Sequence, residues 1–301
     1  MFEKALAYAR LLRLSNGPTA LADVWMGYAV VSGSLAPSWP LLLASLASLA
    51  LYHGGMALND ANDAEKDTAE NRGRPIAEGL ITPSVATWVA RSLLFSGLGL
   101  GIAASASAGS FSGQNVTLLL AIAIVLYNSR LKSTLAGPPL MGACRGLNIM
   151  LGMAVAGGTT IGTAGDGVPV GQFLYITGVT LYARDEAGTP KRSLLAAGAA
   201  MALVGIAWLA TCSSLSDAVS AKPIATIGFW IAVALMATRG MAAAILQPTP
   251  RNLGRGVGIA IQGLVILDAT LAALYAGPMA GLAILALLPV TMLLARWIPQ
   301  T

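Results

Sequence analysis

The chain has 301 residues, of which 56% are apolar and 10% are charged, and its mean hydropathy is +0.72. This composition excludes an ordinary soluble domain and indicates an integral membrane protein. The formal net charge is +5. Because the basic residues lie in the connections between apolar runs, we expect anionic lipid and phosphate as partners and no nucleic acid.

A short basic segment opens the chain, and the apolar runs follow it. Residues 1–14 mix Lys4, Arg10 and Arg13 with apolar residues at helical spacing, which predicts an amphipathic helix on the membrane surface that acts as an anchor. The apolar runs cover residues 18–34, 39–58, 83–104, 116–129, 138–158, 169–183, 194–212, 223–240, 255–276 and 279–296. Runs of this length predict an all-α, polytopic bundle of nine to ten transmembrane helices, forming one domain over residues 1–301.

The basic residues are distributed unevenly between the two sets of connections. One set contains Lys66, Arg72, Arg74, Arg130, Lys132, Arg184, Lys191, Arg192, Arg239, Arg251 and Arg255, and Arg296 ends the last run. The opposite set has Lys222 as its only basic residue. This asymmetry predicts a cytoplasmic N-terminus and a cytoplasmic active site, in a cell membrane of the bacterial kind. No secretory signal is expected, because the first apolar run is followed by further spans.

Residues 59–82 (NDANDAEKDTAENRGRPIAEGLIT) contain six of the thirteen acidic residues and form the first polar loop. Asn59, Asp60, Asp63 and Asp67 have spacings that place them on one face if the segment is helical. Neighbouring carboxylates repel one another unless they bind a proton or a cation, and oxygen ligands suit Mg²⁺. Since Mg²⁺ shares its coordination with substrate phosphates, a diphosphate is the expected ligand.

Two arginines follow the carboxylates. Arg72 and Arg74, in NRGRP, are placed to contact phosphate oxygens, or to stabilise the loop in which Pro75 and Gly79 form a turn. A merely solvated acidic loop is the alternative, and it explains poorly why four polar residues share one helical face next to arginines.

This stretch resembles the first aspartate-rich motif, NDxxDxxxD, of the UbiA superfamily of intramembrane prenyltransferases. The resemblance extends through N-R-x-R-P and Gly79, and the order of the apolar runs fits most of the chain. It implies a bundle of about nine helices around a cavity, with Mg²⁺ bound to a prenyl diphosphate. By the same resemblance, Asn59, Asp60, Asp63 and Asp67 are the metal ligands.

A second basic segment, YNSRLKSTLAGPP, follows the fourth run and contains Arg130 and Lys132. By itself the pair is typical of the cytoplasmic flank of a membrane helix. The segment is also similar to the Tyr-Ser-x-x-Lys region of the superfamily, which supplies a basic residue to the diphosphate. Lys132 is therefore the stronger candidate and Arg130 the weaker one.

The second polar loop, residues 184–193, follows the sixth run, where the superfamily usually has a second DxxxD metal motif. Here Asp185 and Glu186 are followed by Lys191 and Arg192 instead of further carboxylates. The second Mg²⁺ is therefore expected to have fewer protein ligands, or to be replaced in part by Lys191 and Arg192. Tyr182 precedes the loop and is a candidate for the cavity wall or for the membrane interface.

Several polar residues lie in or next to the apolar runs. Arg145, with Asn148 one turn later, is predicted either to bind diphosphate or acceptor, or to form an ion pair with Asp23 or Asp268. Asn16 is a candidate ligand of phosphate or acceptor, or else a helix cap. The remaining candidates are read as packed side chains: His53, Cys144 and Cys212.

The function that these patterns predict is a magnesium-dependent prenyltransferase that ionises a prenyl diphosphate and transfers the prenyl group to a small acceptor, aromatic or cyclitol-like. A UbiA-type cyclase without an acceptor, or a cation-coupled transporter, is the alternative. The DGxxAR signature of CDP-alcohol phosphotransferases is absent. No obligate protein partner is expected.

Overall fold

The computed structural model describes residues 2–70, 73–157, 165–185, 191–214 and 223–298, and the regular structure in these residues is helical. This confirms the predicted all-α fold. The helices are α1 (Phe2–Leu11), η1 (Leu14–Asn16), α2 (Gly17–Ser32), α3 (Trp39–Asn62), α4 (Ala64–Ala69), α5 (Pro83–Ser107), α6 (Phe111–Asn128), η2 (Arg130–Ser133), α7 (Gly137–Val155), α8 (Gly167–Tyr182), η3 (Ala183–Asp185), α9 (Arg192–Ser214), α10 (Pro223–Leu246), α11 (Pro250–Ala276), α12 (Pro278–Leu285) and α13 (Leu287–Ala295).

Hydroxyl caps and prolines fix where several long helices begin. The Ser38, Thr82 and Thr249 side chains accept hydrogen bonds from backbone N–H groups in the first turns of α3, α5 and α11. Each of these helices also has proline in its first turn, where the missing N–H costs nothing. The polar ends of these helices are therefore satisfied locally.

Within the described residues, seven helices are long and apolar enough to cross a membrane: α3, α5, α6, α9, α10, α11 and the unit formed by α12 and α13. Each of the ten predicted runs overlaps a helix or, in the last case, a helix pair that breaks at Ala286. The helices α2, α7 and α8 are shorter or more polar and lie among the others. The number of helices that cross the membrane stays a prediction.

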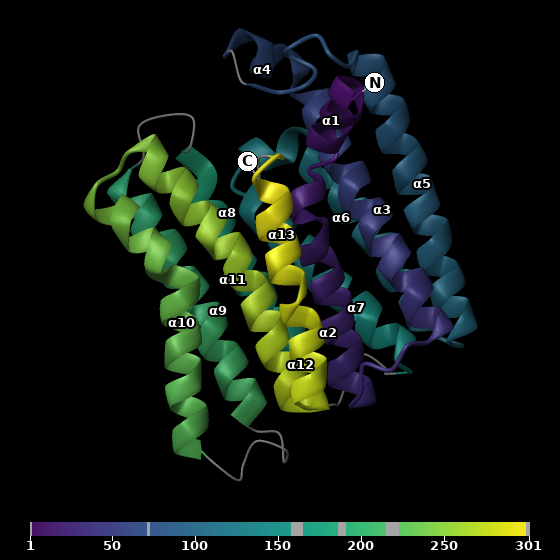
Figure 1. Ribbon diagram of the computed structural model, residues 1–301, viewed down its shortest axis with the longest axis vertical. Coiled ribbons are helices and arrows are strands. Elements are labelled where there is room, and N and C mark those ends of the chain that lie inside the picture. Colours follow the sequence, from purple (N-terminus) through teal and green to yellow (C-terminus); the bar gives the residue numbers. More distant parts are fainter. Residues whose placement is uncertain (1, 71–72, 158–164, 186–190, 215–222, 299–301) are drawn as a thin grey trace.

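The helices α2, α3 and α5–α11 form a closed ring of contacts, and a contact between α2 and α7 divides this ring into two halves. Around the ring, contacts join α3 to α2, α2 to α11, and then α10, α9, α8, α7, α6 and α5 in turn. The helices α2 and α7 also pack directly against each other. Figure 1 shows α1 and α4 together at one end of this bundle. All the polar groups described below as the candidate site belong to that end.

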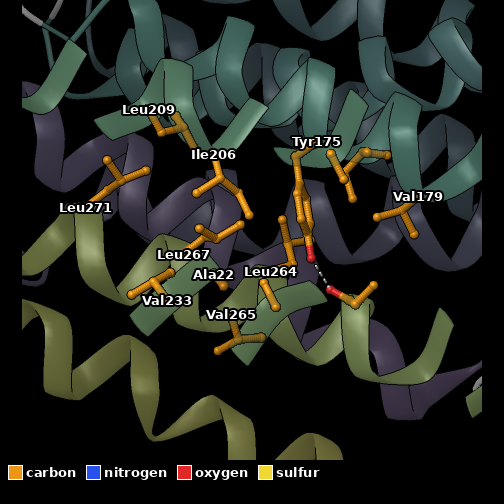
Figure 2. Packing of buried hydrophobic residues seen from close by; sticks show 14 of the residues in the cluster. Ala22, Tyr175, Val179, Ile206, Leu209, Val233, Leu264, Val265, Leu267 and Leu271 are labelled. Carbon is orange, nitrogen blue, oxygen red and sulfur yellow. Dashed lines mark hydrogen bonds between the residues drawn. The ribbon is translucent and has the colours of Figure 1, made fainter. Parts of the chain in front are cut away.

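The half of the ring formed by α8–α11 is filled with apolar side chains. Figure 2 shows side chains from α2, α8, α9, α10 and α11 meeting there, among them Tyr175, Ile206, Leu264 and Leu267. The Tyr175 hydroxyl donates a hydrogen bond of 2.7 Å to the Ala260 carbonyl oxygen, so its one polar group is satisfied. This half acts as a packed core.

Glycines allow α2 and α7 to approach closely. A Cβ atom at Gly27 would overlap the Ile149 carbonyl oxygen, and one at Gly152 would overlap the Val24 carbonyl oxygen. Small residues at such positions let helix backbones touch, which is how helices associate inside a membrane. The contact holds Asp23 of α2 beside Arg145 of α7, as described below.

Candidate active site

Asp60, near the end of α3, is buried and contacts two arginines. Its Oδ1 accepts hydrogen bonds from Arg74 Nη1 at 2.9 Å and from Arg13 Nη2 at 3.3 Å. Its Oδ2 is buried without a hydrogen-bond partner. Two guanidinium groups beside one carboxylate leave one excess positive charge at this point, which favours an anion. The predicted residue Arg74 thus lies beside a predicted metal ligand.

Arg13 reaches Asp60 through an unusual backbone conformation. Its φ of 47° and ψ of 53° put it in the left-handed region, where it is the one non-glycine residue of the described chain with a positive φ. This turn reverses the chain between α1 and η1 and points Arg13 toward the end of α3. The sequence interpretation treated residues 1–14 as an anchor alone and missed this contact. A basic residue immediately before the first apolar run was the available signal.

Lys132, in η2, contacts two further predicted metal ligands, Asn59 and Asp63. Its Nζ donates to Asn59 Oδ1 at 2.8 Å and also forms an ion pair with Asp63. The neighbouring Asn62 Nδ2 donates to the Asn128 carbonyl at 2.7 Å, which ties the end of α3 to the end of α6. The structure therefore brings Asn59, Asp60, Asp63 and Lys132 into one cluster, with Asp63 as the residue between α3 and α4.

The donor set suits Mg²⁺ that is shared with phosphate. Asp67 is buried on α4, one turn after Asp63. In the described part of the chain, no group of three or more His, Cys, Asp or Glu side chains is arranged to hold a metal by itself. Mg²⁺ commonly takes one or two carboxylates and completes its shell with water and substrate oxygens. The unpartnered Asp60 Oδ2 and the Asp63 carboxylate meet that requirement.

A cavity begins one helical turn before Asn59 and Asp60 along α3. Gly55 and Met56 of α3 line it, and it continues between α2, α3, α6 and α7. It holds about 480 Å³ of unfilled space, part of which is open to solvent. Leu51, Leu120 and Ile124 give it an apolar wall.

The opposite wall of the cavity contains Arg145 and Asn148 of α7. Arg145 Nη1 donates to Asp23 Oδ2 at 2.9 Å, and Asn148 Nδ2 donates to the same oxygen at 3.0 Å. The predicted ion pair is therefore formed, and Asp23 is its acid. Asp268 lies next to Asp23 and accepts a hydrogen bond from Gln172. Arg145 and Asn148 also line the cavity.

Among the remaining predicted residues, Asn16 is buried, and His53 and Cys144 are partly buried. Asn16 ends η1, and its carbonyl oxygen accepts a hydrogen bond of 2.7 Å from the Thr19 hydroxyl. His53 Nδ1 lies 2.7 Å from the Leu12 carbonyl oxygen, which agrees with a packed histidine. Cys144 lines the cavity. These contacts fix the start of α2 against α3.

The second loop is described only in part. Arg72, Glu186 and the side chains of Arg130 and Asp185 lie outside the described residues. Lys191 is exposed, and Arg192 donates to the Leu246 carbonyl at 3.1 Å. Tyr182 is buried, and its hydroxyl donates to the Met241 carbonyl at 3.2 Å. Arg192 and Tyr182 thus both donate hydrogen bonds to backbone carbonyls of α10.

An ion pair connects α1 to the loop after α4. Arg10 Nη1 and Nη2 donate to the Glu78 carboxylate at 2.9 and 3.0 Å, and Nη2 also donates to the Gly73 carbonyl at 2.6 Å. The hydrogen bond from Arg10 holds the pKa of Glu78 below its usual value. This pair lies next to the Arg74–Asp60 contact in the chain and steadies the loop that carries Arg74.

The fold and the site define a helical integral membrane protein with a cavity under a cluster of acidic and basic side chains. Known structures share this architecture. A UbiA homologue from Archaeoglobus fulgidus bound to GPP and Mg²⁺ has a TM-score of 0.65 at 14% identity, over 93% of this chain and 99% of that one. A UbiA homologue from Aeropyrum pernix K1 has a TM-score of 0.62 at 19% identity, over 84% and 97%.

A further solved structure is described as a digeranylgeranylglyceryl phosphate synthase in membranes. Its TM-score is 0.60 at 19% identity, over 88% of this chain and 99% of that one. No protein-family model matches the sequence, and no curated protein matches it. At these identities the likeness establishes the fold: this chain has the UbiA superfamily fold, as its sequence motifs predicted.

Proposed function

We propose that this protein is an intramembrane prenyltransferase of the UbiA superfamily. It takes a prenyl diphosphate, transfers the prenyl group to a small acceptor and releases diphosphate. One observation carries the proposal: Asn59, Asp60 and Asp63 lie with Arg13, Arg74 and Lys132 above an apolar-walled cavity. The homologue with bound GPP and Mg²⁺ has the same fold, which supports this assignment.

The carboxylates and the cations have complementary roles. Asn59, Asp60 and Asp63, with Asp67 as a further ligand, would hold Mg²⁺, which supplies positive charge to the diphosphate oxygens. Arg13, Arg74 and Lys132 donate hydrogen bonds to the same diphosphate and stabilise the charge that grows on it as it leaves. Arg72 and Arg130 are assigned the same role from the sequence.

The cavity receives the rest of the substrate. The prenyl chain lies against the apolar side chains of Leu51, Leu120 and Ile124. The bond between its first carbon and the diphosphate oxygen breaks, and the electron pair leaves on the diphosphate. The nucleophilic atom of the acceptor then forms a bond to that carbon and loses a proton. Arg145 and Asn148 are placed to contact the acceptor from the other wall.

The second loop completes the site in this proposal. Asp185 and Glu186 add oxygen ligands for a second Mg²⁺, and Lys191 and Arg192 add positive charge. Asn16 contributes an amide near the first helix, and Tyr182 helps to enclose the substrate. The end of the bundle that carries these groups faces the cytoplasm, and the lipid bilayer surrounds the long helices.

The direct test measures diphosphate release by the purified protein in detergent, with geranyl diphosphate, Mg²⁺ and a panel of small phenols and polyols. Changing Asp60 to Asn removes the charge that Arg13 and Arg74 contact. We expect release to fall by about 10²–10³, the usual effect of losing one preorganised charge in an active site. Glu65→Gln is the control, because Glu65 is an exposed acid of the same stretch.

Folding is checked by gel filtration and thermal unfolding of each variant. Release that persists in a folded Asp60→Asn protein would contradict the assignment. Omission of the acceptor separates transfer from cyclisation, since a transferase should then release little diphosphate.

A further inference from the structure

The cavity wall formed by α7 carries the guanidinium of Arg145, which already forms an ion pair with Asp23. Arg145 is the one charged residue among the described residues that line the cavity, and 12% of its side chain is exposed. Asp23, behind it, is fully buried and accepts its Nη1–H at 2.9 Å. Asp268 is also fully buried beside Asp23. The guanidinium of Arg145 therefore already has a carboxylate partner within hydrogen-bond distance.

Other contacts prevent Arg145 from turning away from Asp23. Its Nη2 donates to the Thr19 hydroxyl at 2.9 Å, and its Cζ lies 5.3 Å from the centre of the Tyr52 ring. Asn148 Nδ2 donates to both Asp23 and the Ala20 carbonyl, at 3.0 and 2.9 Å. The guanidinium is therefore clamped between an acid, a hydroxyl and an aromatic face, and its orientation is fixed before any ligand enters.

The clamp determines which ligands suit this wall. The hydrogen bonds to Asp23 and Thr19 use one N–H of Nη1 and one of Nη2, and a guanidinium has five N–H groups. Hydroxyl oxygens of a neutral ligand can accept from the others at no electrostatic cost. A carboxylate would bring a second or third negative charge to one guanidinium in a poorly solvated place, which is unfavourable.

We propose that the cavity wall at Arg145 and Asn148 is the acceptor subsite, and that it selects an uncharged, hydroxylated acceptor and rejects a carboxylate. This inference rests on the proposed prenyl transfer and deepens it by naming the acceptor class. Asp23 and Asp268 act as positioning and specificity residues, because they set the charge that Arg145 presents without lining the cavity themselves.

The test uses a binding readout that does not depend on turnover. Cys144 lines the cavity, so a bound acceptor should protect it from a neutral maleimide. The Cys212→Ser background leaves Cys144 as the one thiol. The probes are 4-hydroxybenzyl alcohol and 4-hydroxybenzoate, which have similar size but differ by one charge at neutral pH. We expect the alcohol to protect Cys144 at a concentration about tenfold lower or more.

A charge-removing variant should reduce the difference between the two probes. Asp23→Asn leaves Arg145 with one acid fewer, so protection by 4-hydroxybenzoate should improve by about tenfold relative to the alcohol. Ser213→Ala is the matched control: it removes a buried hydrogen bond to Trp230 between α9 and α10, and the order of the probes should not change. If Asp23→Asn does not fold, the comparison of the two probes on the wild-type cavity still decides the question.

Three outcomes have distinct meanings. Equal or better protection by 4-hydroxybenzoate on the wild-type cavity overturns the inference, and so does the absence of protection by either probe. Protection in the expected order, with no prenyl product from geranyl diphosphate, would support the subsite while contradicting the proposed function. Preferential prenylation of the alcohol, detected by mass spectrometry, would support both.

Discussion

Asp60 links three parts of the chain that lie far apart in sequence. Its carboxylate contacts Arg13 before the first long helix and Arg74 in the loop after α4. A buried carboxylate without a cation would be costly, so the two arginines account for its burial. They also give this end of the bundle the positive charge that a diphosphate requires. Arg13 is therefore expected to act on the substrate rather than on the membrane surface.

Arg13 provides the first prediction. Changing Arg13 to Gln removes one charged donor, and hydrogen bonds to charged groups contribute roughly 1.5–3 kcal/mol. We expect kcat/KM for diphosphate release to fall by about ten- to a hundredfold. Arg10→Gln, the matched control, removes a cation that contacts Glu78 instead and should change release by less than about threefold.

A third substitution separates the charge of Arg13 from its backbone. Glycine adopts positive φ without strain, so Arg13→Gly relieves about 1 kcal/mol of strain while removing the charge. Because both variants lose the Asp60 contact but only glycine relieves the strain, Arg13→Gly should unfold at a higher temperature than Arg13→Gln, and its activity should be equally low. Normal activity in both variants would contradict a substrate role for Arg13.

The helix α1 is held to the loop after α4 by a pair whose strength depends on pH. Because Arg10 lowers the pKa of Glu78 in the folded protein, the pair stabilises the fold above the usual glutamate pKa. That stabilisation is lost as the pH falls through the lowered value. We expect amide exchange in residues 3–11 to increase at acid pH relative to neutral pH, after correction for intrinsic rates.

Glu78→Gln isolates this contact. The variant should show the faster exchange of α1 at neutral pH already, and its exchange should change less between neutral and acid pH than that of the wild type. The effect is expected to be small because Glu78 is exposed. Identical pH responses of the two proteins would mean that Arg10 and Glu78 do not hold α1 in place.

The crossing of α2 and α7 provides a prediction about stability. Gly152→Ala places a Cβ against the Val24 carbonyl oxygen, and overpacking of this kind costs roughly 1–3 kcal/mol. Because Val24 is next to Asp23, the shift should also loosen the Arg145 contact. We expect a lower thermal unfolding temperature in detergent and faster maleimide labelling of Cys144.

Gly99→Ala is the control for that substitution. Gly99 lies in the exposed face of α5, and a Cβ there meets nothing within 4 Å. Alanine should be neutral or stabilise the helix by up to about 1 kcal/mol. If Gly152→Ala behaved like this control, the two helices would not be in contact through Gly152.

The sequence predicted the helices far better than the contacts between them. Apolar runs gave the positions of the long helices, but the break at Ala286 was missed. Pro289 was the available signal, because proline has no N–H to donate to the Leu285 carbonyl oxygen one turn earlier. The partner of Arg145 was left open between Asp23 and Asp268. Only the packing of α2 on α7 places Asp23 against it, and sequence periodicity carries no information on that packing.

In the candidate site, too, patterns within a short stretch of sequence were easier to predict than contacts between residues far apart in the sequence. The helical spacing of Asn59, Asp60 and Asp63 was readable, whereas Lys132 is 73 positions from Asn59 and was assigned only through a family resemblance. Arg13 was missed because its approach to Asp60 depends on a left-handed residue that no propensity favours. Long-range contacts and strained turns are set by the complete fold, so local patterns do not reveal them.

The two halves of the bundle differ in a way that matches the two polar loops. The half that contains the NDxxDxxxD stretch surrounds the cavity, and the half formed by α8–α11 is filled by Tyr175, Leu264 and other apolar side chains. The second polar loop, which has few carboxylates, therefore belongs to the half whose interior is filled by apolar side chains. From this arrangement we expect ligand binding to be concentrated at the end of α3, with the second loop in a supporting role.

The orientation of the bundle is the remaining prediction. If the site faces the cytoplasm, α4 lies inside the cell and the end of α5 lies outside, because one long helix separates them. Single cysteines at the exposed positions Lys66 and Ser107, in a Cys144→Ser and Cys212→Ser background, report the two sides. In intact cells, a membrane-impermeant maleimide should label the cysteine at 107 but not the one at 66. Permeabilisation should make both reactive; labelling at 66 alone in intact cells would reverse the orientation, and labelling of both would show that α5 does not cross the membrane.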